Sequence, residues 1–398
     1  MRITSNRRGE LLELTEEQER LLNKGSQGER KAMELLIALG EMYEATNLIP
    51  VTSTHISGAS YKTIGDPGVR FLSEITVGCS SKVNSTVNPI GMDRERYAEM
   101  RVREEFASKQ KEIVGLYEKL GVTNSWTCTP YLIGNRPRLG EHISWAESSA
   151  VVFANSVLGA RTNREGGPSA LASSITGFTP NYGLHDGENR KADVLIELGF
   201  EAGEKDFASL GYSAGEICGN RIPYFRNLSA SEDDLKTLSA SLASSGSVSM
   251  FHIEKLTPEW SLGLNEGYEK VQIEKEDLEN VESLWNTSVE PDLIAIGCPH
   301  CSVGELKKLA RMLEEGSWNG PELWACTSES VSKQAPDAVD VINKYGKVLC
   351  DTCVIVSSVE DFSKAIATNS GKASTYLPSL CKQKIMFSDL ETLVRRFQ

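Results

Sequence analysis

The stretch "PDLIAIGCPHCSVGELKKLARMLEE", residues 291–315, passes from an apolar run to an amphipathic pattern through a turn with two cysteines. Its first part, "DLIAIGC", predicts a buried strand, and 303–315 predicts a helix. Further strand patterns follow at "ELWACTS" and "GKVLCDTCVIV", and further helix patterns at 329–345 and 361–370. Apolar strands that alternate with helices are typical of a parallel sheet covered on both faces. The C-terminal part is therefore predicted to be a doubly wound α/β domain.

The remaining sequence carries similar patterns, separated by polar, glycine-rich segments. We expect helices at 15–45 (interrupted at 24–29), 94–120 and 147–160, a strand and then a loop within 48–68, a polar loop at 80–93, an irregular connection at 123–145, a loop ending in a small-residue helix at 161–177 and a strand at 192–198. A chain of 398 residues is long enough for two or three domains. We place these at 1–135, with leading helices, 136–288 and 289–398.

Composition excludes several classes of protein. The net charge of −13 argues against binding to nucleic acid or to an anionic membrane. No apolar run approaches the ~20 residues that span a bilayer. The N-terminal segment is charged and lacks the apolar stretch of a signal peptide. We expect a cytoplasmic protein whose nine cysteines are reduced.

Two Cys-x-x-Cys pairs, Cys298/Cys301 and Cys350/Cys353, raise the question of a metal. Four thiolates could close a zinc site, but residues i and i+3 of an extended strand point to opposite faces, which is awkward for the second pair. "CPHC" has the letters of a redox dithiol, although the context is not thioredoxin-like. The thiols could also be small buried apolar groups.

A further interpretation takes one cysteine from each of three segments. Cys128 lies in the aromatic loop "WTCTPYL", and with Cys298 and Cys353 it could hold three irons of a [4Fe–4S] cluster. The fourth iron would have no protein ligand and could act as a Lewis acid on a substrate hydroxyl and carboxylate. That chemistry is the chemistry of hydro-lyases. The residues alone leave these alternatives open.

Six motifs resemble those of the aconitase X family. They are "HISGASYKTIGDPGVRFL" (55–72), "NPIGMD" (88–93), "CTPYL" (128–132), "WAESSAVVFANSVLGARTNREGGPSAL" (145–171), "IGCPH" (296–300) and "DTCVIV" (351–356). The resemblance implies three α/β/α domains, as in aconitase, around a central iron–sulphur site. It also implies that the smaller swivelling domain of the family is a separate subunit here, as in archaeal members, so that the chain acts in a heterodimer.

The resemblance further implies an activity and its ligands. The expected reaction is the dehydration of (R)-5-phosphomevalonate to trans-anhydromevalonate 5-phosphate in the archaeal mevalonate route to isoprenoids. The cluster, expected to be [4Fe–4S], maps to Cys128, Cys298 and Cys353. Cys301 and Cys350 depart from the family pattern. The base is expected to be a serine of the small subunit, which leaves the isolated chain nearly inactive.

Other candidate residues combine local chemistry with the resemblance. Small-residue loops expose N–H groups to anions, an Asn amide bonds substrate oxygens, and Lys or Arg binds carboxylate or phosphate. The predicted substrate contacts are Gly58, Ala59, Ser60, Asn88, Pro89, Glu147, Ser148 and Lys372, the last of these for phosphate. Asn163, Arg164 and His300 are candidates for substrate contact or for support of the cluster.

Two other functions remain in view. Fused bacterial relatives of the family dehydrate cis-3-hydroxy-L-proline, a reaction that needs no phosphate site. A non-enzymatic zinc or iron–sulphur protein that senses or scaffolds is an alternative of a different class.

Overall fold

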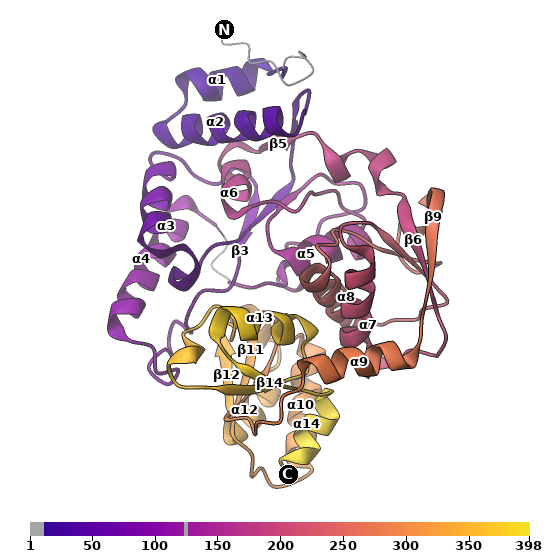
Figure 1. Ribbon diagram of the computed structural model, residues 1–398. Helices are drawn as coiled ribbons and strands as arrows, with labels where there is room; N and C mark the ends of the chain where they lie inside the picture. Colours follow the sequence, from indigo (N-terminus) through magenta and orange to yellow (C-terminus); the bar gives the residue numbers. More distant parts are fainter. Residues whose placement is uncertain (1–11, 123–125) are drawn as a thin grey trace.

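Three parallel sheets surround a common centre in the computed structural model of the chain, which describes residues 12–122 and 126–398 (Figure 1). Their strand orders are β3-β2-β4, β8-β7-β6-β9 and β12-β11-β10-β13-β14, and every pair within them is parallel. The mixed α/β architecture expected from the sequence is confirmed. A short antiparallel pair, β1–β5, accompanies the first sheet.

The N-terminal unit begins with two helices, and each has a capping box, at Thr15/Gln18 and Ser26/Glu29. The second cap explains the predicted break at 24–29, because Ser26 starts a new helix. The elements are α1 Glu16–Lys24, α2 Gln27–Met42, β1 Leu48–Pro50, β2 Ser53–Ile56, α3 Tyr61–Ile75, β3 Asn84–Val87, α4 Glu104–Leu120, β4 Ser144–Trp145, α5 Ser148–Phe153 with a π-turn at Ala154–Leu158, α6 Gly167–Thr176 and β5 Phe178–Pro180.

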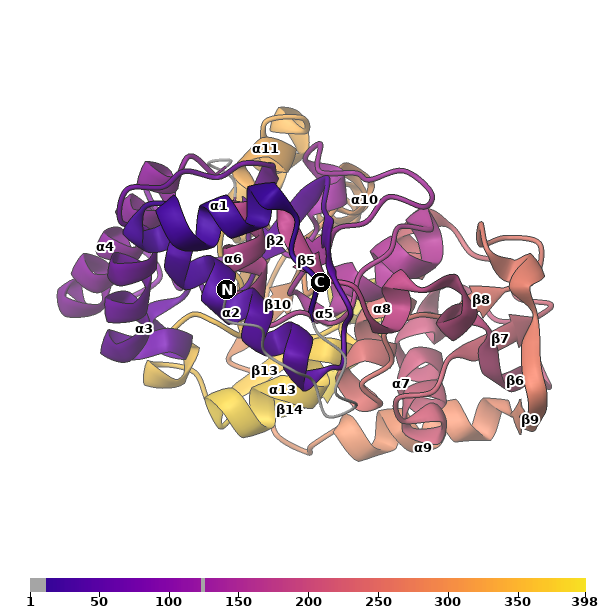
Figure 2. The ribbon, with the colours of Figure 1, turned by 90° about the horizontal axis from the view of Figure 1, so that it is seen from above.

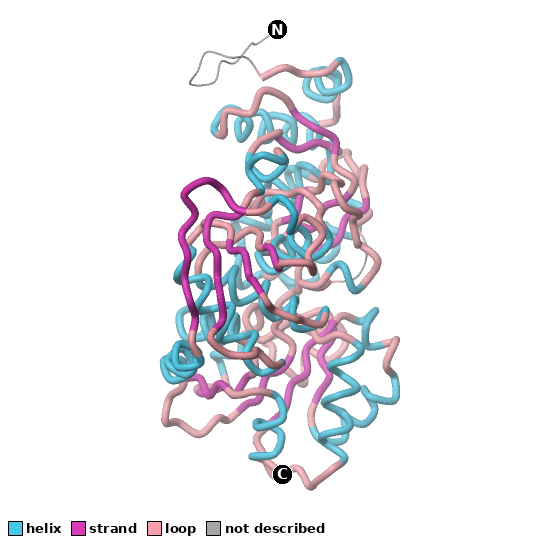
Figure 3. Tube along the Cα trace, turned by 90° about the vertical axis from the view of Figure 1, so that its right-hand side faces the viewer, coloured by secondary structure: helices cyan, strands magenta, loops and turns pink. Residues whose placement is uncertain are grey.

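The middle unit packs its main core between the second sheet and helices α5, α7 and α8. Its elements are β6 Ala192–Leu198, α7 Phe207–Cys218, β7 Pro223–Arg226, α8 Glu232–Ser245, β8 His252–Ile253, β9 Leu264–Ile273 and α9 Lys275–Trp285. Figure 2 places this sheet on the far side of the molecule from α3 and α4, and Figure 3 shows its strands near the surface.

The C-terminal unit is doubly wound. Its elements are β10 Leu293–Ile296, α10 Val303–Glu314, β11 Glu322–Thr327, α11 Glu329–Ser332, α12 Pro336–Tyr345, β12 Lys347–Cys350, β13 Ala365–Thr368, α13 Gly371–Cys381, β14 Lys384–Phe387 and α14 Leu390–Arg396. The strand order reverses between β10 and β13. Ligands of such sheets bind in the crevice at this switch point, outside the carboxyl ends of the strands.

Short 3₁₀ turns complete the description. They lie at Pro130–Leu132, Gly183–His185, Gly187–Arg190, Glu204–Asp206, Trp260–Leu262 and Val359–Asp361. Among the residues that the structure describes, no helix is both long and apolar enough to cross a membrane.

Several predictions of individual elements were wrong. The segment 361–370, expected to be a helix, holds the fully buried strand β13. A strand buried on both faces has no alternating pattern, so periodicity alone does not separate it from a helix. The polar loop 80–93 contains β3, and the helix expected from residue 94 begins at Glu104. Part of the loop expected within 48–68 is the start of α3, which Gly65 interrupts with φ 55°.

Candidate active site

The candidate residues lie where parallel strands end. Carboxyl ends of strands are the edges at which ligands collect in α/β sheets. The residues that follow these ends are Gly58–Ser60 after β2, Asn88 and Pro89 after β3, Glu147 and Ser148 after β4, Cys298 after β10, Cys353 after β12 and Lys372 after β13. Two separate sheets therefore point their site-bearing ends into the centre of the molecule (Figure 1).

Backbone contacts join these ends across the sheets. The Ser60 hydroxyl donates to the Val356 carbonyl at 2.8 Å, three residues beyond Cys353. The Ile90 N–H donates to the Asp351 carbonyl at 2.9 Å. The Thr127 N–H donates to the Val87 carbonyl at 2.9 Å, which fixes the segment before Cys128 beside the end of β3.

The three predicted ligand thiols share one buried neighbourhood. The His300 backbone N–H donates to Cys128 Sγ at 3.2 Å. The Ser370 hydroxyl lowers the pKa of Cys298, and the backbone N–H groups of Ile355 and Val356 lower the pKa of Cys353. Burial is the main cause that raises the pKa of each thiol, to about 12 for Cys298. The metal-free thiols are therefore protonated at neutral pH.

The remaining cysteine of each Cys-x-x-Cys pair, Cys301 or Cys350, has different neighbours. Cys301 is 1% exposed and packs in the apolar core between the third sheet and helices α10 and α12. The thiol of Cys350 donates to the Ser332 hydroxyl at 3.4 Å. Cys128, Cys298 and Cys353 are thus near enough for their charges to interact, whereas Cys301 belongs to the apolar core although it also lines the cavity beside Cys298, and Cys350 contacts Ser332.

A buried ion pair occupies the same centre. The Lys372 ammonium contacts a Glu147 carboxylate oxygen, and both side chains are at most 10% exposed. The other carboxylate oxygen accepts hydrogen bonds from the Ser149 hydroxyl and the Ala150 N–H, both at 2.6 Å. Glu147 is the N-cap of α5, and Lys372 lies in the first turn of α13. The pair therefore connects the N-terminal and C-terminal units at the thiols.

Both members of the pair are charged at neutral pH. Burial opposes ionisation of Glu147, but the charge of Lys372 and the hydrogen bonds that the carboxylate accepts lower its pKa to about 2. Burial likewise opposes protonation of Lys372, and the charge of Glu147 and the hydrogen bond to it outweigh burial, so the pKa of Lys372 is raised. The charges of Glu147 and Lys372 act on all three thiols.

His55 is a residue of this centre that the sequence analysis missed. Its Nε2 lies 3.0 Å from Asn88 Oδ1, and its Nδ1 lies 2.8 Å from the Thr86 hydroxyl. Burial lowers the pKa of His55 to about 4, so the ring is neutral at pH 7. In the tautomer with Nε2–H, His55 fixes the Asn88 amide with its NH₂ group free for a ligand. A histidine at the end of a strand, directly before a glycine-rich loop, was the available signal.

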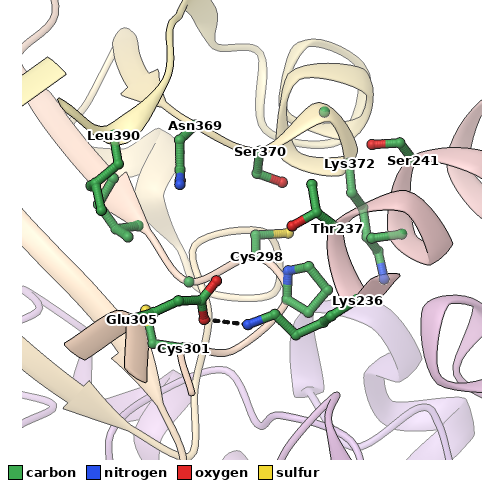
Figure 4. A pocket seen from close by; sticks show the side chains of 15 residues that line it. Lys236, Thr237, Ser241, Cys298, Cys301, Glu305, Asn369, Ser370, Lys372 and Leu390 are labelled. Carbon is green, nitrogen blue, oxygen red and sulfur yellow. Dashed lines mark hydrogen bonds and ion pairs between the residues drawn. The ribbon is translucent and has the colours of Figure 1, made fainter. Parts of the chain in front are cut away.

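A cavity adjoins the centre at the switch point of the third sheet. Figure 4 shows Asn369 and Ser370 from the β13 end, Cys298 from the β10 end and Thr237 from α8 facing it. Gly297, with φ 97°, passes so close to the Cys326 carbonyl that a Cβ would collide with it. Cys298 thus lines this cavity together with Thr237, a residue of the middle unit.

Three further candidates differ in where they lie. The Asn163 amide is bonded to the Tyr182 carbonyl and the Leu184 N–H, and this fixes a turn of the backbone. One Arg164 nitrogen lies 3.5 Å from the Ala243 carbonyl near the end of α8. Ser148 is half-buried, whereas its neighbour Ser149 carries the hydrogen bonds to the ion pair.

Comparison with known proteins gives the family. Models of the first, second and third domains of aconitase X match residues 11–188, 192–283 and 291–397. The chain belongs to the aconitase X family. The three matched segments correspond to the three sheets described above.

Relatives of the chain agree with this membership. The phosphomevalonate dehydratase large subunit of Methanocaldococcus jannaschii is 48% identical, covering 96% of this chain and 99% of its own length. The crystal structure of the holo-form of aconitase X from Thermococcus kodakaraensis matches with a TM-score of 0.91 and 40% identity, over 97% of this chain and all of that chain. A cis-3-hydroxy-L-proline dehydratase from Pseudomonas aeruginosa is more distant, 33% identical over 92% of this chain and 67% of its own length.

Thiols from three separate segments are the donor type that iron–sulphur clusters use. Within residues 12–122 and 126–398, no group of three His, Cys, Asp or Glu side chains could hold one metal ion. The thiolates of a cluster bind different iron atoms and therefore need not meet at one point. Cys128 also accepts a hydrogen bond from the His300 N–H, and such a bond tunes cluster thiolates.

Proposed function

We propose that the chain is the large subunit of a phosphomevalonate dehydratase, a hydro-lyase of the mevalonate route to isoprenoids. It would convert (R)-5-phosphomevalonate to trans-anhydromevalonate 5-phosphate in the cytoplasm. The observation that carries the proposal is the buried Glu147–Lys372 pair, whose charges act on the buried Cys128 and Cys353 and on the half-buried Cys298. Archaeal relatives between 37 and 48% identical have this name.

The proposed cofactor is a [4Fe–4S] cluster held by Cys128, Cys298 and Cys353. With three thiolate ligands, such a cluster supplies Lewis-acid assistance to the departure of hydroxide from a hydroxy acid. The N–H and O–H groups that point at the three sulphurs would stabilise their thiolate form.

The chain's own side chains would bind and orient the substrate. Gly58, with φ 83°, opens the loop Gly58–Ser60, whose N–H groups can face an anion. The Asn88 amide, oriented by His55 and followed by the stiff Pro89, offers its NH₂ group to a substrate oxygen. Glu147 and Ser148 would complete the contacts at the start of α5, where the helix dipole favours negative charge.

Lys372 has a more specific role than the sequence suggests. Its charge is already balanced by Glu147, and its ammonium also lies 3.3 Å from the Ser149 hydroxyl. It therefore adds little net positive charge for a phosphate and acts as a fixed hydrogen-bond donor to the substrate. The ion pair would also keep Glu147 ionised, so that the carboxylate accepts hydrogen bonds from substrate hydroxyls.

The base that removes the substrate's C2 proton would come from the partner. The name of the relatives, large subunit, implies a small subunit that acts with the chain. We assign to it a swivelling domain that closes over the site and supplies a serine. No nucleic acid or membrane enters the proposal.

The test is a purified complex made by anaerobic co-expression with the neighbouring small-subunit gene. We expect dehydration of (R)-5-phosphomevalonate by the complex, little by the large subunit alone, and none of cis-3-hydroxy-L-proline. Turnover of the hydroxyproline instead would reassign the substrate. Full activity of the large subunit alone would contradict the role given to the partner, and a complex that dehydrates neither compound would contradict the proposal.

A further inference from the structure

His300 makes contact with all three thiol-bearing segments and is fully buried. Its backbone N–H donates to Cys128 Sγ at 3.2 Å. Its ring Nδ1 lies 3.0 Å from the hydroxyl of Thr127, the residue before Cys128. Its ring Nε2 lies 2.9 Å from the carbonyl of Thr352, the residue before Cys353. His300 itself stands two residues after Cys298.

The partners of the ring fix its tautomer. A carbonyl oxygen only accepts, so Nε2 carries the proton and donates it to Thr352. In the neutral ring Nδ1 then accepts from the Thr127 hydroxyl, whose oxygen in turn accepts the Thr129 N–H at 3.1 Å. The two ring nitrogens thus bind two different segments, with donors and acceptors matched throughout.

A second ion pair, Lys236–Glu305, contacts the backbone of His300. The Lys236 ammonium of α8 donates to the His300 carbonyl at 3.2 Å and pairs with Glu305 of α10, a contact drawn in Figure 4. Lys236 is 2% exposed. Residues of the N-terminal, middle and C-terminal units therefore meet at one histidine.

The geometry points to His300 as a positioning residue that holds the Cys128, Cys298 and Cys353 segments in register for the cluster. Both of its ring nitrogens are bonded to protein groups, so its role is to set the separations of the three sulphurs. The inference rests on the proposed cluster and adds the residue that assembles its ligands. Residues that orient metal ligands typically change metal affinity by about 10- to 100-fold when they are replaced.

The test measures the cluster and not turnover. Wild-type complex and variants are reconstituted anaerobically with iron and sulphide, and the decay of the visible cluster absorbance is followed after exposure to air. We expect His300→Leu to lose its cluster about 10- to 100-fold faster than wild type. His300→Gln retains a donor and an acceptor, so its cluster should decay more slowly than that of His300→Leu. Thr127→Val removes one of the ring's hydrogen bonds, and its cluster should decay at a rate between those of wild type and His300→Leu.

His252→Leu is the matched control. His252 is also fully buried, and its Nε2 lies 2.7 Å from a backbone carbonyl, that of Arg190, in the middle unit. It should lower thermal stability without faster cluster loss. A readout without metal is alkylation of Cys128 by iodoacetamide in the unloaded chain, which should be faster in His300→Leu and unchanged in His252→Leu.

The outcomes are distinct. Fast cluster loss in His300→Leu with wild-type behaviour of His252→Leu supports the inference. Equal loss in both variants, or wild-type decay in His300→Leu, overturns it while the proposed function stands. A wild-type complex that takes up no iron and sulphide overturns the proposed cluster, and the inference with it. Should His300→Leu fail to fold, His300→Gln and Thr127→Val still decide between these results.

Discussion

Two buried ion pairs, Lys372–Glu147 and Arg190–Glu259, look alike in burial and differ in surroundings. Their side chains are 10% and 4% exposed in the first pair, and 0% and 13% in the second. Arg190 also donates to the carbonyls of Leu184, Asn155 and Ala160, at 3.0 to 3.1 Å. Its charge is thus balanced by Glu259, and its N–H groups are bonded to carbonyls of the segment after α5 and of the turn at Gly183–His185.

Lys372, by contrast, has few hydrogen-bond acceptors around its ammonium, and its charge acts on groups that could ligate a metal. Besides Glu147, its ammonium contacts the Ser149 hydroxyl, and its charge acts on Cys128, Cys298 and Cys353. The difference teaches that burial of a charge does not identify a functional site. What identifies it is that the neighbouring groups can react or ligate a metal.

The largest effect is expected when Arg190 of the Arg190–Glu259 pair is replaced. Arg190→Met should lower the free energy of unfolding by about 3–5 kcal/mol, because Glu259 keeps only its 3.9 Å contact with Arg161 and three carbonyls lose their donor. Denaturant unfolding measures this. Activity per folded molecule should stay at the wild-type level, and loss of activity beyond the unfolded fraction would break the distinction between the pairs.

The second largest effect is expected when Lys372 of the Lys372–Glu147 pair is also replaced by methionine. Lys372→Met should reduce the dehydration rate of the complex by about 10²–10³-fold, because an oriented charge is lost from a water-poor site. Its stability should fall as well, so steady-state rates are normalised to folded protein by circular dichroism. A rate within tenfold of wild type would place Lys372 with Arg190 as a structural residue.

The sequence predicted the centre better than it predicted the path of the chain. The strand that precedes Cys298 was recognised from its apolar run, and the three thiols came from their segments and the family resemblance. Periodicity failed at β13, whose fully buried run has no alternation, although that strand delivers Lys372. Pairing partners are equally hidden, because the Glu147–Lys372 contact joins residues 225 positions apart.

Residue roles were less predictable than positions. Ser148 and Ser149 are adjacent and identical in type, and only the turn of α5 shows that Ser149 faces the pair. His55 was passed over because its contact with Asn88 spans two strands. Neither contact leaves a spacing signal in the sequence.

The dependence of stability on pH tests His185, which is close enough to Arg190 for the charge of Arg190 to affect its pKa. Burial, with the nearby charges of His142, Arg190 and Arg161, lowers the pKa of His185 from 6.5 to about 3. Between these values the unfolded chain binds the proton and the folded chain does not, so stability falls as pH falls below 6.5, by at most about 1.4 kcal/mol per pH unit. His185→Asn should flatten the stability profile between pH 6.5 and 5. An unchanged slope would contradict the buried, neutral state of the ring.

The smallest effect concerns the two serines. Ser149→Ala removes a hydrogen bond to each member of the Lys372–Glu147 pair and should lower kcat by about five- to tenfold, the net worth of one ordinary hydrogen bond of about 1–1.4 kcal/mol. Ser148→Ala should instead raise KM, because Ser148 is proposed to contact the substrate. Steady-state kinetics on the complex separate the two, and the reverse pattern would exchange the roles.

The most direct measurement counts iron and acid-labile sulphide in anaerobically reconstituted single-cysteine variants. The account predicts about four irons per chain in wild type and the same in Cys301→Ser and Cys350→Ser. It predicts loss of most of that iron in Cys128→Ser, Cys298→Ser and Cys353→Ser. Full iron in Cys128→Ser, or its loss in Cys301→Ser, would contradict the assignment of the three converging thiols.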